Sequence, residues 1–417
     1  MKICFMTLGT RGDVQPYLAL AKELISLGNK AVICTSESFK NLIENEGVEF
    51  CKATLDLMAI ASTDDGKAVL ENPIKNMKLA IKMSKEIISP RYRQTFDDFY
   101  SAAIDCDVIV YHPKAFVAVD IAIKLSIPCI SMPPVPITYP ITEFPCIAIS
   151  PAKNFGAFFN RLTYSFNSKA ESGYIKQIND FRTNTLKLTS RKAGQYTYFA
   201  NDKEIPIIYP ISKYLFNDVK SWNNHVTLTG FFFLDTNENL DNDLEIFLSK
   251  GKKPISISFS SMPVKNPDDF TKKLHKALKE TSNRAVLLVG NSGIDIKNDE
   301  TIFVVKQAPH TKLFPRSKAV IHHGGAGTTA TALLSGIPQL IVPFATDQLF
   351  WAQRVYKKGV SLEPFKEADL TWQKLSKAFL SFEDKDIIEK ANEMSVKIKK
   401  ENGLQNAAEF IMSVKCI

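Results

Sequence analysis

The stretch Val320-Ile-His-His-Gly-Gly-Ala-Gly-Thr-Thr-Ala330 decides the organisation of the whole chain. It begins within a short apolar run, Ala319 to Ile321, which predicts a buried strand. A glycine-rich turn follows, and a helix is then expected from Thr328 to Ser335, with Gly336 as its stop signal. Glycine lets an anion approach the main chain closely, and the first amides of a helix lack partners inside it. Strand, turn and helix together therefore predict a site for an anion such as a phosphate.

Two histidines, His322 and His323, stand where this strand ends. A histidine beside the turn can donate a hydrogen bond to a phosphate oxygen, which favours a phosphate site. The alternative is an ordinary tight connection between a strand and a helix, with both side chains satisfied inside the protein. The turn alone does not decide between the two.

Several short motifs surround this turn in a fixed order between Thr301 and Ser361. They are Gln307-Ala-Pro-His310, Leu313-Phe-Pro315, His322-His-Gly-Gly-Ala-Gly-Thr328, Gly336-Ile-Pro338 and Pro343-Phe-Ala-Thr-Asp-Gln348. In this order they resemble the donor-binding segment of nucleotide-sugar glycosyltransferases with the two-domain GT-B fold. Within that group the resemblance is to sterol glucosyltransferases and to bacterial macrolide and glycopeptide glycosyltransferases. It rests on the order of the motifs, since no single motif would justify it.

The resemblance implies a set of donor-binding residues. His322 would hydrogen-bond the diphosphate, the glycine-rich turn would cradle it with main-chain amides, and Asp347 with Gln348 would hold sugar hydroxyls. Gln307 to His310 would flank the nucleobase, and the Ala308 main chain would read its edge. The full donor-side set is Thr10, Ser261, Gln307, Ala308, His322, Gly325, Ala326, Gly327, Thr328, Asp347 and Gln348. Asp347 can also serve as a helix N-cap, and the two roles are compatible.

This chain departs from the family pattern at two places on the donor side. Plant members place a glutamate for the ribose where this chain has Ala330, so uridine and thymidine both stay open as the nucleoside. After the first strand of the second half, the family has glycine and then serine, whereas this chain has Ser260 and Ser261.

Both halves of the chain read as the opening of a doubly wound parallel sheet. In the first half, an apolar run from Ile3 to Leu8 precedes a glycine-containing loop, a helix expected from Tyr17 to Leu27 with Pro16 at its first position, and a strand from Ala31 to Thr35. A second series begins at Pro254. The sequence predicts an α/β chain, and the resemblance implies GT-B architecture, with two facing Rossmann-like domains and a cleft between them.

The expected boundaries follow from composition and from the resemblance. An N-terminal acceptor-binding domain covers residues 1–236, and a polar linker covers 237–253. A C-terminal nucleotide-sugar-binding domain covers 254–400, and 401–417 form a helix that would pack back on the first domain. A helical stretch is also expected from Asn154 to Tyr198.

Asp13 is the candidate catalytic base. It lies in Gly9-Thr-Arg-Gly-Asp-Val-Gln-Pro16, directly after the first strand, and so at the floor of the expected cleft. By resemblance it would deprotonate the acceptor hydroxyl. An ordinary aspartate is a weak base for an alcohol, so burial by a bound acceptor would have to raise its pKa. The alternative is that Asp13 only caps the following helix.

The acceptor side is expected around a proline-rich loop, Pro133 to Pro145, that cannot be helix or central strand. The candidate acceptor-binding residues are Pro134, Tyr139, Phe144 and His112, and the last of these could also assist Asp13. The alternative for the loop is an ordered connection without contact to a ligand.

Composition excludes several classes of function. A net charge of +8 over 417 residues, without a long run of Lys and Arg, argues against a nucleic-acid partner. Seven scattered cysteines without a C-x-x-C pair indicate reduced thiols and a cytoplasmic location. No apolar stretch is long enough for a membrane helix, while a peripheral membrane contact stays open. Asp241-Asn-Asp243 reads as a solvated turn, and no metal site is expected.

The function that the resemblance implies is inverting, metal-independent transfer of a hexose, with glucose favoured. The donor would be a nucleotide-diphosphate sugar, UDP-glucose rather than a dTDP-sugar, acting as substrate and without a cofactor. The acceptor would be a hydroxyl of a lipophilic molecule such as a sterol, polyketide, flavonoid or lipid. Two alternatives remain: a nucleotide-sugar epimerase of similar architecture and a non-catalytic sugar-nucleotide-binding protein. The sequence shows no acidic cluster of the epimerase kind, and Asp13 with Asp347 and Gln348 argues against the second.

Overall fold

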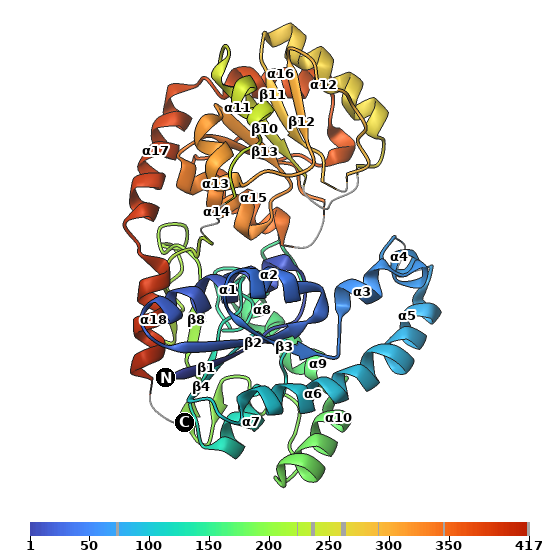
Figure 1. Ribbon diagram of the computed structural model, residues 1–417, viewed down its shortest axis with the longest axis vertical. Helices are drawn as coiled ribbons and strands as arrows, with labels where there is room; N and C mark the ends of the chain where they lie inside the picture. The colour runs from blue at the N-terminus through green and yellow to red at the C-terminus, as the bar shows by residue number, and fades with distance from the viewer. Residues whose placement is uncertain are drawn as a thin grey trace.

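The structure of the chain is a computed structural model that describes residues 1–71, 75–222, 224–234, 238–259, 264–290, 292–344 and 347–414. Two parallel sheets with helices packed on them form two domains, one above the other in Figure 1. The prediction of an α/β chain with two Rossmann-like domains is confirmed. No helix within the described ranges is both long and apolar enough to cross a bilayer.

The N-terminal sheet has seven strands, and every pair in it is parallel. Its order is β3-β2-β1-β4-β5-β8-β9. The strands are β1 Lys2–Met6, β2 Lys30–Ser36, β3 Glu49–Ala53, β4 Val108–Tyr111, β5 Cys129–Ser131, β8 Ile207–Tyr209 and β9 Val226–Leu228. The central strand β1 pairs with β2 on one side and β4 on the other, and its side chains from Ile3 to Met6 are all buried. Helices on both faces explain why these strands are continuous apolar runs.

Ten α-helices of the described chain belong to this domain. They are α1 Arg11–Ser26, α2 Lys40–Asn45, α3 Leu57–Ser62, α4 Asp64–Glu71, α5 Met77–Met83, α6 Ser89–Ala103, α7 Ala118–Leu125, α8 Ala157–Thr163, α9 Phe166–Ser172 and α10 Ile175–Asp180. A small antiparallel pair, β6 Phe199–Ala200 and β7 Lys203–Glu204, completes the domain.

Two helix predictions for this domain are wrong. Helix α1 begins at Arg11 rather than Tyr17, because Thr10 and Asp13 form a capping box that starts the helix early and leaves Pro16 inside it. The stretch expected to be helical from Asn154 to Tyr198 is divided into α8, α9, α10 and a π-helical turn that ends with Lys187 at φ 59°. Both corrections reflect capping and local backbone geometry that apolar periodicity does not report.

The C-terminal sheet has five parallel strands in the order β12-β11-β10-β13-β14. These are β10 Ile255–Ser258, β11 Ala285–Leu288, β12 Ile302–Val305, β13 Ala319–His322 and β14 Gln339–Ile341. The helices are α11 Asn242–Ser249, α12 Pro267–Thr281, α13 His310–Leu313, α14 Ala326–Ser335, α15 Gln348–Lys357, α16 Trp372–Ser381 and α17 Lys385–Lys399. In both sheets the strand order turns back beside the first strand, which is where such sheets bind ligands.

The chain connects the two domains twice. Part of the predicted linker, 237–253, is helix α11, whose Leu244, Phe247 and Leu248 pack into the C-terminal core. Asp241 caps this helix by accepting a hydrogen bond from the Asp243 amide at 2.9 Å. At the other end, α17 runs back toward the first domain, and α18 Gly403–Ser413 lies against α1 (Figure 1).

An aromatic contact, here called the domain seam, holds the two domains together. Phe144, Phe216 and Trp222 of the first domain share one buried cluster with Phe350 and Trp351 of α15. The Phe144 and Phe350 ring centroids are 5.0 Å apart.

An ion pair completes the seam. The Arg354 guanidinium, almost fully buried, stands 4.6 Å from the centroid of Phe216 and hydrogen-bonds both carboxylate oxygens of Asp218 at 2.6 and 2.7 Å. Burial opposes ionisation of Asp218, but the hydrogen bonds and charge of Arg354 outweigh it and lower the pKa of that carboxyl. The seam therefore combines apolar packing with one charge-assisted contact.

Removing the Asp218 carboxylate should weaken the seam. In Asp218→Ala the buried guanidinium of Arg354 loses its partner, and we expect the free energy of unfolding to fall by about 2 kcal/mol. Adding Arg354→Met keeps a long apolar side chain over Phe216 and should restore most of that loss. Urea unfolding followed by fluorescence of the seam tryptophans measures both variants. A double variant as unstable as Asp218→Ala would contradict this account of the ion pair.

Candidate functional site

The candidate site is shared between the two domains, at the carboxyl ends of strands in each sheet. From the first domain come the loop after β1 and the residues after β4, and from the second come the ends of β10 and β13. The pKa of His310, at the start of α13, is lowered to about 4 by burial first, then by the charges of His323 and Arg11. Arg11 begins α1 in the first domain, so the charges of both domains act on this histidine.

Asp13 is held by four groups from the first domain. Its Oδ2 accepts hydrogen bonds from the Thr10 amide at 2.7 Å and the Thr10 hydroxyl at 3.2 Å. Lys114 Nζ lies 3.3 Å from the same oxygen, and His112 Nε2 lies 3.1 Å from Oδ1. About a fifth of the Asp13 side chain remains exposed. Both sequence interpretations of Asp13 are therefore compatible, because the residue caps α1 and still reaches solvent.

The protonation of His112 follows from its two partners. Its Nδ1 accepts a hydrogen bond from the Lys114 amide at 3.0 Å, so the proton of a neutral ring sits on Nε2 and is donated to Asp13. Burial lowers the pKa of His112, and the contact with Asp13 only partly offsets that effect. His112 is thus a buried, neutral donor behind the carboxylate, with 3% of its side chain exposed.

The pKa of Asp13 is well below its usual range. Burial alone would raise it, but the hydrogen bond and charge of His112, the charge of Lys114 and the Thr10 amide together outweigh burial. The carboxylate is therefore ionised in the structure. A role as base would require an acceptor to raise this pKa, as the sequence analysis expects, for example by separating Lys114 from the carboxylate.

Gly9 permits this arrangement. Its backbone has φ 142°, and a Cβ placed there would overlap the Asp13 carboxylate and the Lys114 ammonium. A side chain at this position would have to displace the carboxylate from the start of α1.

His322, in contrast to its predicted role, has both ring nitrogens engaged inside the protein. Nε2 lies 2.9 Å from Gln339 Oε1, and Nδ1 accepts from the Gly324 amide at 3.1 Å. The ring is fully buried, and burial lowers its pKa to about 3 despite the bond to Gln339. The ring could bond a diphosphate only by breaking one of these contacts. His322 thus fits the alternative interpretation of a satisfied histidine that fixes the turn.

His323 was not selected from the sequence, although it is the neighbouring residue in the same motif. Its Nδ1 is buried and has no hydrogen-bond partner in the described part of the chain. The ring lies beside Gly325, where a Cβ would collide with Nε2. Burial lowers its pKa, while a hydrogen bond to the Ser258 main chain and the Asp347 charge act in the opposite direction. An unsatisfied buried nitrogen of this kind marks a place where a ligand can complete the hydrogen bonding.

The first turn of α14 is open to a ligand. No side chain caps it, since its N-cap is Gly325. Gly327 is exposed, and a Cβ built on it would meet no atom within 4 Å. The unpaired amides of a helix start, in open space, suit an anion. The helix begins at Ala326, two residues earlier than predicted, which puts Ala326, Gly327 and Thr328 in its first turn.

Asp347 and Gln348 begin α15 on the same side of the domain. Asp347 is the N-cap, but its Oδ2 accepts from the Trp351 indole at 3.0 Å rather than from a first-turn amide. Gln348 is buried, and its Oε1 accepts from the Phe344 amide at 2.7 Å. These contacts hold Gln348 beside Gly324 and Asp347 where its charge acts on His323.

The remaining donor-side residues are less informative. Thr10 and Gln307 are exposed and Ala308 is half-buried, while Ser261 falls outside the described residues.

The proline-rich loop serves the packing of the protein. Phe144, predicted to bind acceptor, is buried in the domain seam, and Pro134 is buried as well. The Tyr139 ring stacks on His225, with centroids 4.8 Å apart, and its amide donates to the Tyr209 hydroxyl at 2.9 Å. The interpretation of this loop as an ordered connection fits these contacts, because such aromatic side chains stabilise the fold wherever a facing ring is available. His112 lies behind Asp13 rather than at the surface of the cleft.

Comparison with known proteins agrees with this geometry. Residues 3–136 match the glycosyltransferase family 28 N-terminal domain, and residues 291–409 match the C-terminal domain of erythromycin biosynthesis protein CIII-like proteins. Among solved structures, the glycosyltransferase of kitacinnamycin and the calicheamicin glycosyltransferase CalG4 each superpose with a TM-score of 0.70. They are 17% and 16% identical to the chain, cover 99% of it, and are themselves covered to 98% and 97%.

Similar curated proteins are sterol 3-beta-glucosyltransferases. UGT80A2 and UGT80B1 of Arabidopsis thaliana are 32% and 30% identical over 98% of this chain, which spans 65% and 67% of their lengths. The enzyme of Vanderwaltozyma polyspora is 31% identical over 98% of the chain, which spans only 34% of it. Matches over nearly the whole chain, together with the two facing sheets, show that the chain belongs to the GT-B glycosyltransferases of the UDP-glycosyltransferase superfamily.

Proposed function

We propose that the chain transfers a hexose from a nucleotide-diphosphate sugar to a hydroxyl of a lipophilic acceptor. The observation that carries the proposal is that two chemically complementary parts lie at the carboxyl-terminal strand ends of the two domains. A hydrogen-bonded carboxylate, Asp13, lies at the end of a strand in one domain. An uncapped helix start beside His323, whose Nδ1 has no hydrogen-bond partner among the described residues, lies at the end of a strand in the other.

The start of α14, with His323 beside it, suits the diphosphate leaving group of such a transfer. A diphosphate at the first turn of α14 would accept hydrogen bonds from the amides of Ala326, Gly327 and Thr328, where a Cβ on Gly327 would meet no atom of the described residues within 4 Å. A proton on Nδ1 of His323 would be donated to the same group, so this residue takes the role that the sequence analysis gave to His322. Such donors stabilise the charge that develops as the bond to the sugar breaks, without requiring a metal ion.

The Asp13 carboxylate suits activation of the acceptor hydroxyl. The acceptor hydroxyl would give its proton to Asp13 while its oxygen bonds to the anomeric carbon. The bond from that carbon to the diphosphate would break in the same displacement, releasing a nucleoside diphosphate. Because the attacking and leaving oxygens lie on opposite faces, one displacement inverts the configuration. His112 would hold the carboxylate in position by donating from Nε2.

The substrate classes in the proposal come from the relatives. The names of the curated relatives specify glucose as the sugar and a sterol as the acceptor, which supports a glucose donor and an apolar alcohol for this chain. UDP-glucose is the favoured donor and a dTDP-sugar the competitor, because Ala330 leaves the ribose contact open. We place the reaction in the cytoplasm, in agreement with the cysteine usage.

Donor binding is the first test, with Gly327 as the probe. Calorimetric titration should show binding of UDP-glucose that EDTA does not change. In Gly327→Ala the new methyl group occupies the space proposed for the diphosphate, and we expect at least tenfold weaker binding. The fold should not suffer, because alanine is the better helix former.

The matched control is Gly173→Ala, at the end of α9, where φ is negative and a Cβ meets only ordinary contacts. It should bind the donor like the parent. Equal affinity of Gly327→Ala and the parent would remove α14 from the donor site, and absence of any donor binding would overturn the proposed function.

Asp13→Asn tests the base. The amide keeps an oxygen to cap α1 but cannot take a proton, so kcat should fall by about 10²- to 10⁴-fold while the donor dissociation constant stays unchanged. The control is Asp384→Asn, which alters the exposed N-cap of α17 and should leave kcat unaffected. Transfer by Asp13→Asn at the parental rate would exclude Asp13 as the base.

Lys114 should set the pH at which Asp13 works. Its positive charge favours the ionised carboxylate, so Lys114→Met should raise the pKa of Asp13. The acid limb of the kcat/KM profile should then move to higher pH, because protonation of the base sets in earlier as the pH falls. The measurement is kcat/KM against pH for both enzymes. A shift to lower pH, or an unmoved limb, would contradict the electrostatic role of Lys114.

A further inference from the structure

The first domain exposes an unusual group of large apolar side chains. Between residues 149 and 166 they are Ile149, Phe155, Phe158, Phe159, Leu162 and Phe166, here called the α8 surface. Phe158, Phe159 and Leu162 on α8 are 71%, 60% and 58% exposed. Six large apolar side chains exposed within 18 residues of sequence are more than the scattered single residues of an ordinary protein surface.

The α8 surface is held rigidly in this exposed state. Asn160, on the opposite side of α8, is fully buried and uses both ends of its amide. Its Nδ2 donates to the Thr142 carbonyl at 2.8 Å and to Asn154 Oδ1 at 2.9 Å, while its Oδ1 accepts from the Phe155 amide at 3.0 Å. These bonds fix the helix with its apolar face outward, so the exposure does not result from a loose segment.

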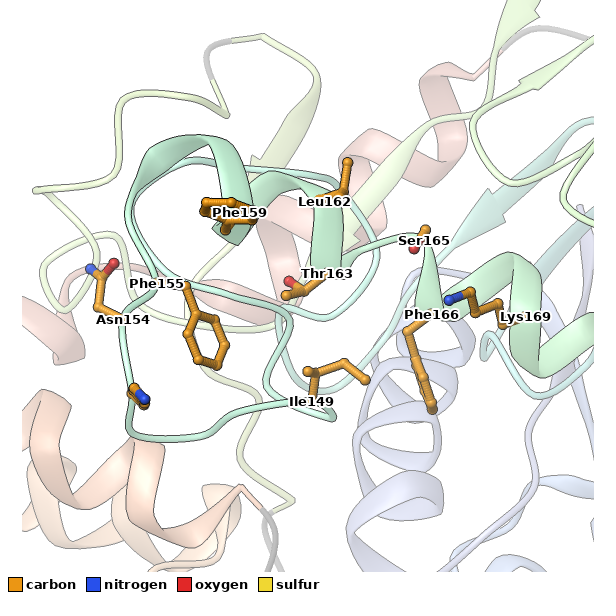
Figure 2. A pocket seen from close by; sticks show the side chains of 10 residues that line it. Ile149, Asn154, Phe155, Phe159, Leu162, Thr163, Ser165, Phe166 and Lys169 are labelled. Atoms are coloured by element: carbon orange, nitrogen blue, oxygen red, sulfur yellow. The ribbon is translucent and has the colours of Figure 1, made fainter.

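The same side chains surround an open hollow of about 640 Å³. Figure 2 shows Phe155, Ile149 and Phe166 around this hollow, with Phe159 and Leu162 on the adjacent helix α8. Lys153 and Lys169 also line it. The hollow can take up apolar chains while basic groups stand at its edge.

The charged side chains within residues 144–170, the segment that carries the α8 surface, have one sign. Residues 144–170 include Lys153, Arg161 and Lys169, all exposed, and no Asp or Glu. The Lys153 ammonium lies 5.7 Å from the centroid of the Phe155 ring, so the charge directly adjoins the apolar side chains. Apolar side chains bordered by basic ones match the chemistry of an anionic lipid surface, which offers phosphate groups above hydrocarbon.

A second copy of the chain fits the α8 surface less well. In a two-fold symmetric dimer the same patch would face itself, bringing like charges together around the apolar centre. The position of the surface also matters, because Asn154 Nδ2 donates to the Glu143 carbonyl at 3.1 Å, next to Phe144 of the domain seam. The α8 surface therefore adjoins the boundary between the domains.

We propose that the α8 surface docks the protein on an anionic phospholipid membrane. Phe158, Phe159 and Leu162 insert among the lipids, and Lys153, Arg161 and Lys169 contact the phosphate groups. This contact does not depend on the proposed reaction, since it requires neither donor nor turnover.

The test is sedimentation of the full chain with vesicles of phosphatidylcholine alone or with 30% phosphatidylserine. We expect binding to the anionic vesicles that weakens with added salt. Phe158→Ser/Phe159→Ser should reduce the partition coefficient by at least tenfold. Lys153→Gln/Lys169→Gln should reduce it by roughly tenfold on anionic vesicles and hardly at all on neutral ones.

Phe199→Ser is the matched control, because Phe199 lies on β6 of the same domain and is 55% exposed. Thermal unfolding and donor titration establish that each variant is folded. Equal vesicle binding by the parent and the double Phe variant would overturn the proposal, as would no binding by the parent. Sedimentation equilibrium that shows a dimer of the parent and a monomer of the double Phe variant would overturn it in favour of self-association.

Discussion

The domain seam is the contact on which the candidate site depends. The carboxylate that would accept a proton and the turn that would hold a diphosphate belong to different domains, so neither sheet contains a complete site. Phe144, Phe216 and Phe350, with the Arg354–Asp218 ion pair, set how the two sheets face one another. Helix α18, lying against α1, adds a second attachment between the halves. A residue far from the chemistry, such as Asp218, can therefore affect the site by changing its geometry.

In each domain, one buried histidine dominates the electrostatics of the candidate site. His112 and His322 are both neutral and hydrogen-bonded on both nitrogens, and each positions a neighbour: His112 orients the Asp13 carboxylate, and His322 holds the Gly324 amide. In both cases burial disfavours the charged ring, which then acts as a directed donor. Asp13 differs because His112 and Lys114 outweigh burial and keep it ionised.

The order of motifs and the apolar periodicity were sufficient to predict the fold and the family. Parallel strands buried on both faces are short apolar runs, and glycine-rich turns at their ends are visible in any sequence. Local capping was harder to predict: the Thr10–Asp13 capping box starts α1 before Pro16, and proline normally suggests a later start. Residues Leu244 to Leu248 could have revealed α11, but the polar run before them obscured it.

The candidate site was only partly predictable, because side-chain contacts between distant segments are not encoded in any local pattern. The sequence cannot show that Gln339 satisfies His322, while His323 Nδ1 has no partner in the part of the chain that the structure describes. Nor can it show that Phe144 contacts Phe350, which is 206 residues later in the sequence. Because of this contact, Phe144, which was predicted to bind the acceptor, packs in the domain seam. The Lys114 side chain, two residues after His112, reaches Asp13 only because β4 and β1 are neighbours.

Lipid docking and glycosyl transfer, if combined, would place an apolar acceptor close to the seam. The α8 surface adjoins the Glu143–Phe144 segment, and that segment packs on the helix that Asp347 and Gln348 begin. The position of the α8 surface beside the domain seam thus relates an apolar acceptor to the fold, and no further residue is added to the site.

The stereochemistry of the product tests the central claim most directly. UDP-glucose carries an α-linked sugar, so a single displacement assisted by Asp13 yields a β-glucoside. Incubation of the chain with UDP-glucose and a sterol, followed by proton NMR of the anomeric signal, measures the outcome. A β-linked glycoside is the predicted result, and an α-linked glycoside would contradict single displacement at this cleft.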